Sequence, residues 1–547
     1  MKKTMYLRIS VLVALGVIMA ACQKQELPDT AEGSPLTFTA TVRMEASETK
    51  ALTGEGVKTF SAGDRIAVVY RNSAGKTVRA ESASLAVSDI TGNGKTASFT
   101  VVLTDPDKTK QVTFIYPAVM AKADGSVNHE LLASQNGTIE YIAEHLDYCE
   151  FTGEWDGSKL PDGIMVNKLA ICAFTLKDES GAVDLTGTVT EMTISDGTHS
   201  YIIKRKPVPG PVYVALRPAS GADMTYEVTG SRLYTKSVKA ETLEAGHFYP
   251  QGLKMAELPM NIVDLSKLSG HYEAKNRDVL TGTLSGKYKI TVADGAFVIL
   301  RDVTIDGGKK EDESEVWAGI TPLGDAILFL EGTNTVQSFG GLHPGIYAAE
   351  GHTLTIRGDG KLTVKSVGGG CGIGGGCHIL FAIVGKDIIN CGDIVIDGGT
   401  IDAFGLCSGI GAPNSGRCGN ITINGGNVNA TGKLGAGIGT GMPGIRARSS
   451  CGNITINGGT VTAQGSASFA GIGGGTGNTL CGNITISPDV ERVQATKGND
   501  APNAIGPGKD GKCGIVTIGG TIYWDGRAYQ NNGGRYLTSS PLVYPAP

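Results

Sequence analysis

The sequence lacks a long apolar stretch after its first 21 residues, carries little net charge and contains none of the short motifs of common catalytic sites. No later segment reaches about 18 uninterrupted apolar residues, so we expect no transmembrane helix. A formal net charge of −5 over 547 residues, without a basic stripe, argues against a nucleic-acid partner. The Gly-x-Ser-x-Gly, His-Glu-x-x-His and phosphate-loop motifs are all missing. We therefore expect no cofactor and no enzymatic activity.

The one long apolar run opens the chain. A basic pair precedes it, it extends over Val11–Ala21, and it ends in Met-Ala-Ala followed by Cys22. Small residues before a cysteine are typical of a bacterial lipoprotein signal, and an ordinary secretory signal is the alternative. We expect residues 1–21 to be removed, Cys22 to carry the lipid and residues 22–35 to form a flexible tether. The protein is then anchored in the cell outer membrane, and we expect it to be surface-exposed.

Charge is scarcest in the C-terminal half, where glycine is most abundant. Glycine makes up 80 of 547 residues, about twice its average usage, and is concentrated after Gly340. A glycine-rich tract of low charge is typical of disorder. Isoleucine and valine nevertheless recur in register here, which favours a packed core. Only seven charged residues lie between Cys391 and Cys481: Asp393, Asp397, Asp402, Arg417, Lys433, Arg446 and Arg448.

A repeated motif defines this half of the chain. Cys-Gly-Asn-Ile-Thr-Ile-Asn-Gly-Gly begins at Cys418 and again at Cys451, and looser copies begin at Cys391, Cys481 and Cys513. Successive copies start 27, 33, 30 and 32 residues apart. Self-similarity at this period predicts stacked units, each of which buries its apolar face against its neighbours.

Three apolar tracks within each unit predict the type of solenoid. The first is an Ile-x-Ile strand, whose alternation places isoleucine inside and the intervening Thr or Val outside. The second follows a Gly-Gly corner, and the third is a small-Gly-Ile element such as Gly471-Ile472. Three short strands per turn with glycine corners predict a right-handed parallel β-helix over residues 269–525. We expect about eight coils, roughly 40 Å in length, with residues 526–547 as a C-terminal cap.

Residues 36–255 carry the signals of an all-β sandwich, and a linker is expected at 256–268. Short runs such as Arg65–Val69 and Val212–Leu216 alternate with Gly, Asp, Ser or Pro. Four motifs occur here in a fixed order: Phe60–Val68 (Phe-Ser-Ala-Gly-Asp-Arg-Ile-Ala-Val), Phe114–Pro117, Lys168–Ile171 and Glu244–Tyr249.

These four motifs, placed after a lipoprotein signal, resemble the fimbrillin-like lipoproteins of Bacteroidales. The resemblance implies two transthyretin-like lobes and, in pilus subunits, polymerisation by strand donation after a protease removes an N-terminal segment. Arg43 and Lys50 lie where such a cut would fall, with an exposed basic loop residue as the alternative. A shaft subunit ends with its donor strand, whereas this chain continues to Pro547. A pilus accessory, tip or free-standing surface protein, with other fimbrillin-like subunits as partners, therefore fits better.

The cysteine-led units and Phe469–Gly475 resemble the glycine-rich repeat modules of bacterial surface proteins, some of which bind carbohydrate. The resemblance covers residues 315–525 and favours adhesion or glycan binding at a host or bacterial surface. In the first track the outward side chains form an array of amides and hydroxyls, and such groups can hydrogen bond to sugar hydroxyls. Stacked Asn residues also stabilise a solenoid without a ligand. The candidate ligand-binding residues are Asn420, Thr422, Asn424, Asn453, Thr455, Asn457, Asn483 and Thr485.

Two further kinds of site remain as alternatives: an acid–base site and a metal site. Asp393, Asp397 and Asp402 form the only carboxylate cluster of the repeats, as a polysaccharide lyase or hydrolase would need, but the neighbouring copies have Asn instead. A metal site could draw on the His and Cys residues between 343 and 378, although no tight ligand spacing supports it. The metal candidates are His343, His352, His378, Cys371 and Cys377.

The cysteines predict a core feature rather than a disulfide framework. Eleven are present, and five occupy one motif position. Stacked about 4.8 Å apart in parallel strands, these five aim their Cβ atoms alike, so we expect a buried ladder of thiols. Taken together, the sequence predicts a surface adhesin or glycan-binding protein. A non-binding pilus or envelope spacer and a polysaccharide-degrading enzyme are the alternatives.

Overall fold

The structure is a computed structural model in which strands dominate and helices are short. The predicted signal peptide, Cys22, most of the tether, Lys50, His378 and Arg446 lie outside the described residues. No helix in the described part of the chain has the length and hydropathy that a membrane span requires. The described residues are 35–44, 59–108, 110–156, 158–285, 287–307, 316–377, 388–444 and 447–545.

The first lobe is formed by an eight-stranded sheet in the order β3-β2-β6-β8-β9-β1-β5-β4. Alternate side chains, such as Phe99 of β5 and Phe114 of β6, meet in one core, so the two halves of the sheet face each other as a sandwich. Arg43 lies inside β1, paired with Thr96 and Ile164 of the flanking strands. The strands are β1 (Pro35–Met44), β2 (Ala67–Arg71), β3 (Thr77–Glu81), β4 (Ile90–Thr91), β5 (Thr96–Thr104), β6 (Gln111–Tyr116), β8 (Cys149–Glu154) and β9 (Gly163–Asn167).

The second lobe is another eight-stranded sandwich, in the order β13-β10-β16-β15-β14-β11-β12-β7. Phe174 and Tyr226 meet edge to face in its core with their ring centroids 5.5 Å apart. Ala67 and Ile115 of the first lobe join the same core, so the two lobes share apolar packing. Its elements are β7 (Ser134–Gln135), α1 (Ile139–Tyr141), β10 (Ala170–Asp178), β11 (Glu191–Ser195), β12 (Ser200–Lys204), β13 (Val212–Leu216), β14 (Ala219–Thr229), β15 (Leu233–Leu243) and β16 (Phe248–Glu257).

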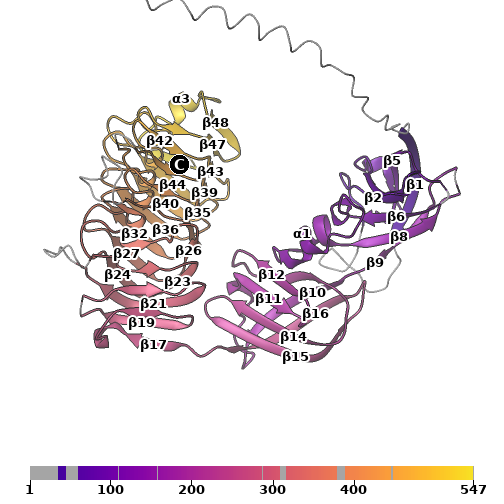
Figure 1. The fold of residues 1–547 in the computed structure, drawn as a ribbon, viewed down its shortest axis with the longest axis horizontal. Coiled ribbons are helices and arrows are strands. Elements are labelled where there is room, and N and C mark those ends of the chain that lie inside the picture. Colours follow the sequence, from indigo (N-terminus) through magenta and orange to yellow (C-terminus); the bar gives the residue numbers. More distant parts are fainter. Residues whose placement is uncertain are drawn as a thin grey trace, which may run out of the picture.

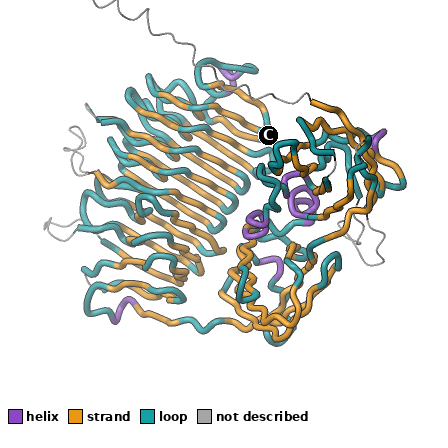
Figure 2. Tube along the Cα trace, turned by 45° about the vertical axis from the view of Figure 1, so that its right-hand side comes forward, coloured by secondary structure: helices purple, strands orange, loops and turns teal. Residues whose placement is uncertain are grey.

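The C-terminal half is a parallel β-helix that stands beside the second lobe (Figures 1 and 2), so the predicted all-β class, sandwich followed by β-helix, is confirmed. Its first strand, β17, lies inside the stretch predicted as a linker, because β16 runs on to Glu257 and only three residues separate the two strands. The first strand column contains β17 (Asn261–Asp264), β19 (Asp278–Thr283), β21 (Ala296–Ile305), β23 (Ala326–Glu331), β26 (Thr353–Gly358), β31 (Asp393–Ile396), β35 (Ile421–Ile423), β39 (Ile454–Ile456), β43 (Ile484–Ile486) and β47 (Ile515–Ile518).

The second strand column pairs strand on strand beside the first, and a glycine directly precedes each of its strands except the last. Inward residues of both columns, such as Ile421, Ile454 and Val461, are fully buried, as the alternation predicts. The strands are β24 (Thr333–Gln337), β27 (Lys361–Lys365), β32 (Thr400–Gly405), β36 (Asn427–Gly432), β40 (Thr460–Gln464) and β44 (Arg492–Thr496).

The remaining strands of each coil are very short. Where three strands per coil are predicted, the cysteine position adds a fourth, since each cysteine pairs in register with the one in the next coil. The third column is β25 (Ile346–Tyr347), β28 (Ile373–Gly374), β33 (Ile410–Gly411), β37 (Ile438–Gly439), β41 (Ile472–Gly473) and β45 (Ile505–Gly506). The cysteine column is β34 (Arg417–Cys418), β38 (Ser449–Cys451), β42 (Thr479–Cys481) and β46 (Lys512–Cys513). Shorter pairings involve β18 (Tyr272–Ala274), β20 (Ile290–Val292), β22 (Thr321–Pro322), β29 (Gly376–Cys377) and β30 (Ile388–Ile389).

Antiparallel strands end the stack. β48 (Thr521–Asp525) folds back on β47, and β49 (Leu542–Tyr544) pairs antiparallel with β44. The chain between them includes α3 (Gly533–Tyr536), and Leu537 and Leu542 are buried in the β-helix core. This segment covers apolar surface that a further coil would otherwise bury.

The glycine after each third-column isoleucine adopts a backbone conformation that other residues avoid. Gly439 has φ of 135°, and a Cβ atom there would lie 2.1 Å from the carbonyl oxygen of Gly473 in the next coil. The same position in neighbouring coils has φ between 121° and 134°: Gly374, Gly411, Gly473 and Gly506.

Substituting one of these glycines should therefore destabilise the β-helix. We expect Gly439→Ala to lower the free energy of unfolding by about 2 kcal/mol or more, through backbone strain and contact with the next coil. Thermal unfolding followed by circular dichroism measures the change. Gly341→Ala is the matched control, because a Cβ there meets nothing within 4 Å. Equal melting of the two variants would contradict the argument.

Candidate functional site

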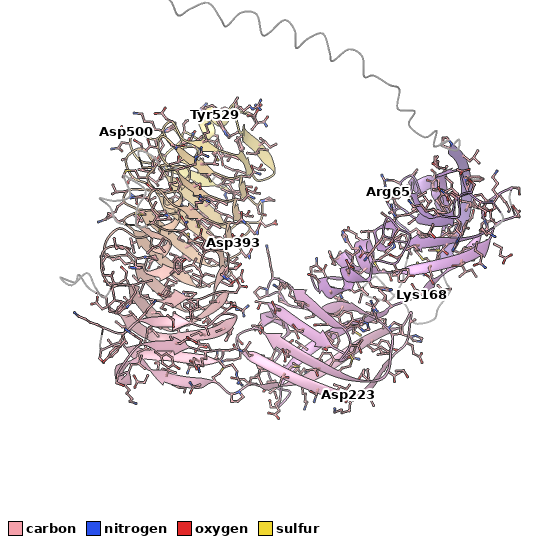
Figure 3. The ribbon with its side chains drawn as sticks, viewed as in Figure 1. Arg65, Lys168, Asp223, Asp393, Asp500 and Tyr529 are labelled. Atoms are coloured by element: carbon pink, nitrogen blue, oxygen red, sulfur yellow. The ribbon has the colours of Figure 1, made fainter. Side chains whose placement is uncertain are left out.

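The outward face of the first strand column carries the predicted ligand-binding residues, and the structure brings them together. Thr422 pairs in register with Val395 and Thr455, and Thr455 pairs in turn with Thr485. Thr485 is exposed, and the other two threonines are half-buried. Figure 3 shows Asp393, at the head of this array, on the side of the β-helix that faces the sandwich lobes. The result is a flat column of hydroxyls with asparagines on either side.

The first asparagine column is occupied in holding the coils together. The Oδ1 atom of Asn420 accepts the backbone N–H of Asn453 at 2.9 Å, and that of Asn453 accepts the N–H of Asn483 at 2.9 Å. Asp393 begins the series by accepting the N–H of Asn420 at 2.6 Å, and Ile515 ends it at 2.9 Å from Asn483. We call this series the asparagine ladder. Since its oxygens are occupied, the polar groups that remain on this face are the other amide groups and the threonine column.

A second series runs along the far end of the same strands. Asn457 donates from Nδ2 to Oδ1 of Asn424 at 2.8 Å, and Asn424 donates to Asp397 at 2.7 Å. In the neighbouring column Asn429 donates to Asp402 at 2.8 Å. Asp393, Asp397 and Asp402, the possible acid–base cluster, thus each accept a hydrogen bond from the coil that follows.

Among the described residues, those proposed for a metal site do not form a group of three close ligand atoms. Nδ1 of His352 lies 3.5 Å from Oδ1 of Asp325, and Asp294 completes an exposed group whose ligand atoms lie within 4.8 Å of one another. His343 is half-buried, and its desolvation together with the charge of Lys289 lowers its pKa to about 4. The two cysteines of the proposal lie elsewhere, in a buried cluster with a third: Cys371, Cys377 and Cys407.

The cysteines of the repeat form a column inside the wall of the β-helix. All ten described cysteines are free and buried. Sγ of Cys451 lies 3.3 Å from Sγ of Cys481, its register partner in the next coil. Burial raises the pKa of Cys391 well above its ordinary value, so its thiol stays protonated and unreactive at neutral pH.

An apolar cluster joins the β-helix to the second lobe. Val279, Phe297, Ile299 and Phe329 point outward from the first coils, and Leu233 of the second lobe packs against them. Aromatic and β-branched side chains on an outer strand face are unusual where water would cover them, and here the lobe covers them.

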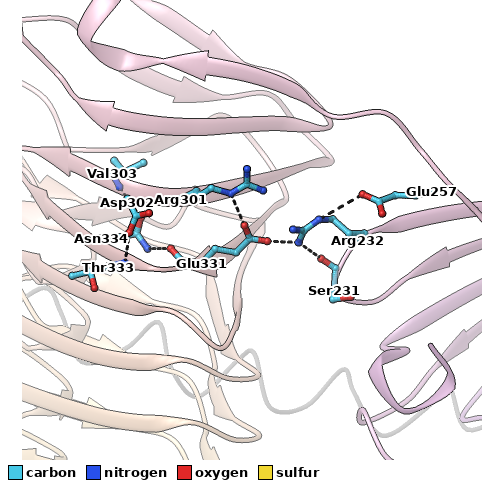
Figure 4. A network of polar contacts seen from close by, with 9 residues as sticks. All are labelled: Ser231, Arg232, Glu257, Arg301, Asp302, Val303, Glu331, Thr333 and Asn334. Atoms are coloured by element: carbon cyan, nitrogen blue, oxygen red, sulfur yellow. Dashed lines mark hydrogen bonds and ion pairs between the residues drawn. The ribbon is translucent and has the colours of Figure 1, made fainter. Parts of the chain in front are cut away.

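Beside this cluster lies a polar network, shown in Figure 4. Glu331 of β23 forms ion pairs with Arg232 of the second lobe and with Arg301 of the preceding coil, the latter at 2.6 Å. Arg232 also reaches Glu257 at 3.7 Å. Both Glu331 and Arg232 are largely buried, so the pair is shielded from solvent more than a surface ion pair is.

A cleft opens along this junction, and sequence reasoning missed it. Two overlapping hollows of about 810 and 790 Å³ lie between the β-helix and the second lobe. We call them together the junction cleft, and both are lined by Thr190, Pro207, Arg357 and Asp397. Asn424 lines one of them, so the polar face of the β-helix continues into the cleft.

A family model supports the β-helix part of the fold. A family described as a beta helix repeat matches residues 421–442 and 454–476. No curated protein matches the chain. A fimbrial assembly protein from Parabacteroides distasonis is 11% identical, covering 40% of this chain and 91% of its own, with a TM-score of 0.25. The tip fimbrial protein of Porphyromonas gingivalis, truncated at its C-terminus, is 11% identical, covering 41% and 96%, with a TM-score of 0.21.

The asparagine ladder makes a prediction about stability. Asn453→Ala removes the acceptor of the Asn483 N–H, and we expect a loss of about 1 kcal/mol. Asn453→Asp keeps the acceptor, as Asp393 does two coils earlier, and should melt close to the wild type. Calorimetric melting of both variants measures the difference. If alanine and aspartate behave alike, the ladder does not stabilise the coils in this way.

Proposed function

We propose that this protein is a lipid-anchored surface adhesin of the cell outer membrane whose β-helix binds glycans. The observation that carries the proposal is the in-register column of Thr422, Thr455 and Thr485, which presents hydroxyls at the spacing of the coils on a rigid face. Sugars offer hydroxyls at comparable density, and a repeated array can bind several of them at once.

The resemblance of residues 36–255 to fimbrillin-like lipoproteins supports a surface location and contact with other fimbrial subunits. In that family an N-terminal strand is removed to open a groove. Here β1 lies between β9 and β5, so its removal would leave both of those strands unpaired on one side. The same proposal includes a role for this protein as an accessory or tip component of a pilus.

A non-binding spacer is the second candidate, and one observation favours it. The asparagine ladder satisfies its own oxygens, so the β-helix is stable without a ligand. We propose binding over catalysis because Asp393, Asp397 and Asp402 are engaged in coil-to-coil hydrogen bonds. Incubation with polysaccharides, followed by analysis of chain length, tests this point, and shortened chains would favour an enzyme.

A glycan and mucin array probed with the mature chain tests the proposal. The triple variant Thr422→Val, Thr455→Val and Thr485→Val removes the hydroxyls but keeps the side-chain shape and the asparagine ladder. We expect its affinity for the bound glycan to fall at least about tenfold, since each hydrogen bond contributes about 1 kcal/mol.

The matched control changes threonines that point outward from the second strand column. Thr431, Thr462 and Thr496 are half-buried, as Thr422 and Thr455 are, and valine at all three should leave binding unchanged. Absence of binding to any glycan would favour the spacer. Equal loss in both triple variants would show that the threonine column is not the binding face.

A further inference from the structure

A buried arginine in the junction cleft lacks partners for two of its three guanidinium nitrogens. Arg357 lies in β26 with 5% of its surface exposed. Its Nη1 donates a hydrogen bond to Oγ1 of Thr190 in the second lobe, and the group lies over the ring of Phe297, 5.4 Å from the centroid. Nε and Nη2 have no hydrogen-bond partner among the described residues. These two atoms form the edge that receives a carboxylate through two parallel hydrogen bonds.

The charge of this arginine remains in the cleft at neutral pH. Burial lowers the pKa of Arg357 to about 10, while the charges of Asp397 and Glu191 raise it. The group is therefore a cation near pH 7, and its unpartnered donors carry an uncompensated cost of desolvation.

Three of the carboxylates around the cleft have other partners, and none of them bonds to Arg357 in this structure. Asp397 accepts a hydrogen bond from Asn424, and Glu191 lies 3.7 Å from Lys204 in an ion pair. Glu331 is held by Arg232 and Arg301. The free edge of Arg357 is thus suited to an anionic group that comes from outside the chain.

The remainder of the lining limits what kind of anion fits. In the hollow of about 810 Å³, Glu257, Asp359 and Asp397 outweigh Arg357 and the paired Arg232, so this hollow would repel a polyanion, whereas Lys204, Arg205 and Lys206 line only the other hollow. The same carboxylates accept hydrogen bonds from hydroxyls, and Tyr234 and Phe329 add apolar surface. A volume of about 810 Å³ matches a small ligand such as one or two sugar rings.

We propose that the junction cleft binds a sugar that bears a single carboxylate, with Nε and Nη2 of Arg357 receiving the carboxylate and the lining acids receiving the hydroxyls. The inference rests on the proposed glycan-binding function and names its ligand class. Both nitrogens are closed to solvent in this structure, so the carboxylate reaches them after a rotation of the Arg357 side chain toward the hollow.

Calorimetric titration of the mature chain tests the ligand class. The probes are glucuronic acid, N-acetylneuraminic acid, glucose, acetate and a peptide with a free C-terminal carboxylate. We expect at least one acidic sugar to bind at least tenfold more tightly than glucose or acetate. Acetate that binds as tightly as the sugars, or a peptide that binds more tightly, would overturn the proposal.

Variants of Arg357 test the site. Arg357→Gln should weaken binding of the acidic sugar at least tenfold, and Arg357→Lys, which keeps the charge but loses the two-donor edge, should also weaken it. Arg417→Gln, an exposed arginine in the cysteine column, is the control and should bind as the wild type does. Unchanged binding by Arg357→Gln would place the sugar elsewhere.

A melting experiment separates binding from structure. Because Arg357 buries donors without partners, we expect Arg357→Met to melt no lower than the wild type, while the acidic sugar raises the melting temperature of the wild type only. A lower melting temperature for Arg357→Met would assign the arginine a structural role. Binding that is lost with Arg357→Gln but kept by the threonine variant would move the glycan site from the array to the cleft. The opposite result would retain the proposed function and refute this inference.

Discussion

The structure of the C-terminal half depends on one constraint: each inward isoleucine or valine must lie directly above its counterpart in the next coil. Ile421, Ile454 and Ile484 follow this rule without a register shift, and all three are fully buried. A slip of one residue would turn these side chains outward and bring the threonines inside. The asparagine ladder, the cysteine column and the glycine corners all rely on this register, because each of them joins equivalent positions of adjacent coils.

The contact between the β-helix and the second lobe depends on outward side chains and not on the repeat. The first coils carry Phe297 and Phe329 on their outer face, where later coils carry Thr and Asn. The outer face is therefore apolar where the second lobe covers the β-helix, and polar where the β-helix is open to solvent. Glu331 reinforces the contact by pairing with an arginine on each side of it. The junction cleft lies at the edge of this contact, so its shape depends on the position of the second lobe against the β-helix.

The periodic part of this architecture could be predicted from the sequence, and the junction could not. The alternation of apolar and polar residues and the regular spacing of the repeats predict the strand columns and their buried side chains. The outward threonines follow from the same alternation. The fourth strand was missed because two-residue strands leave no periodic signal. The place of Arg357 in the cleft could not be predicted, since nothing in the sequence shows that Thr190, separated from it by 167 positions, lies beside it. The link between the halves is shorter than the predicted residues 256–268, because β16 runs on to Glu257 and β17 begins at Asn261.

The two identical motifs at Cys418 and Cys451 have a consequence for the evolution of the molecule's length. Coils that share the same motif at the same contacts can be gained or lost as whole units by recombination between such copies. Each event would move the terminal segment by about 4.8 Å along the axis and leave the surviving neighbours matched as before. The first coils cannot be exchanged in this way, since their outer side chains pack against the second lobe. Variation in reach is therefore expected at the distal end, while the geometry around the junction stays constant.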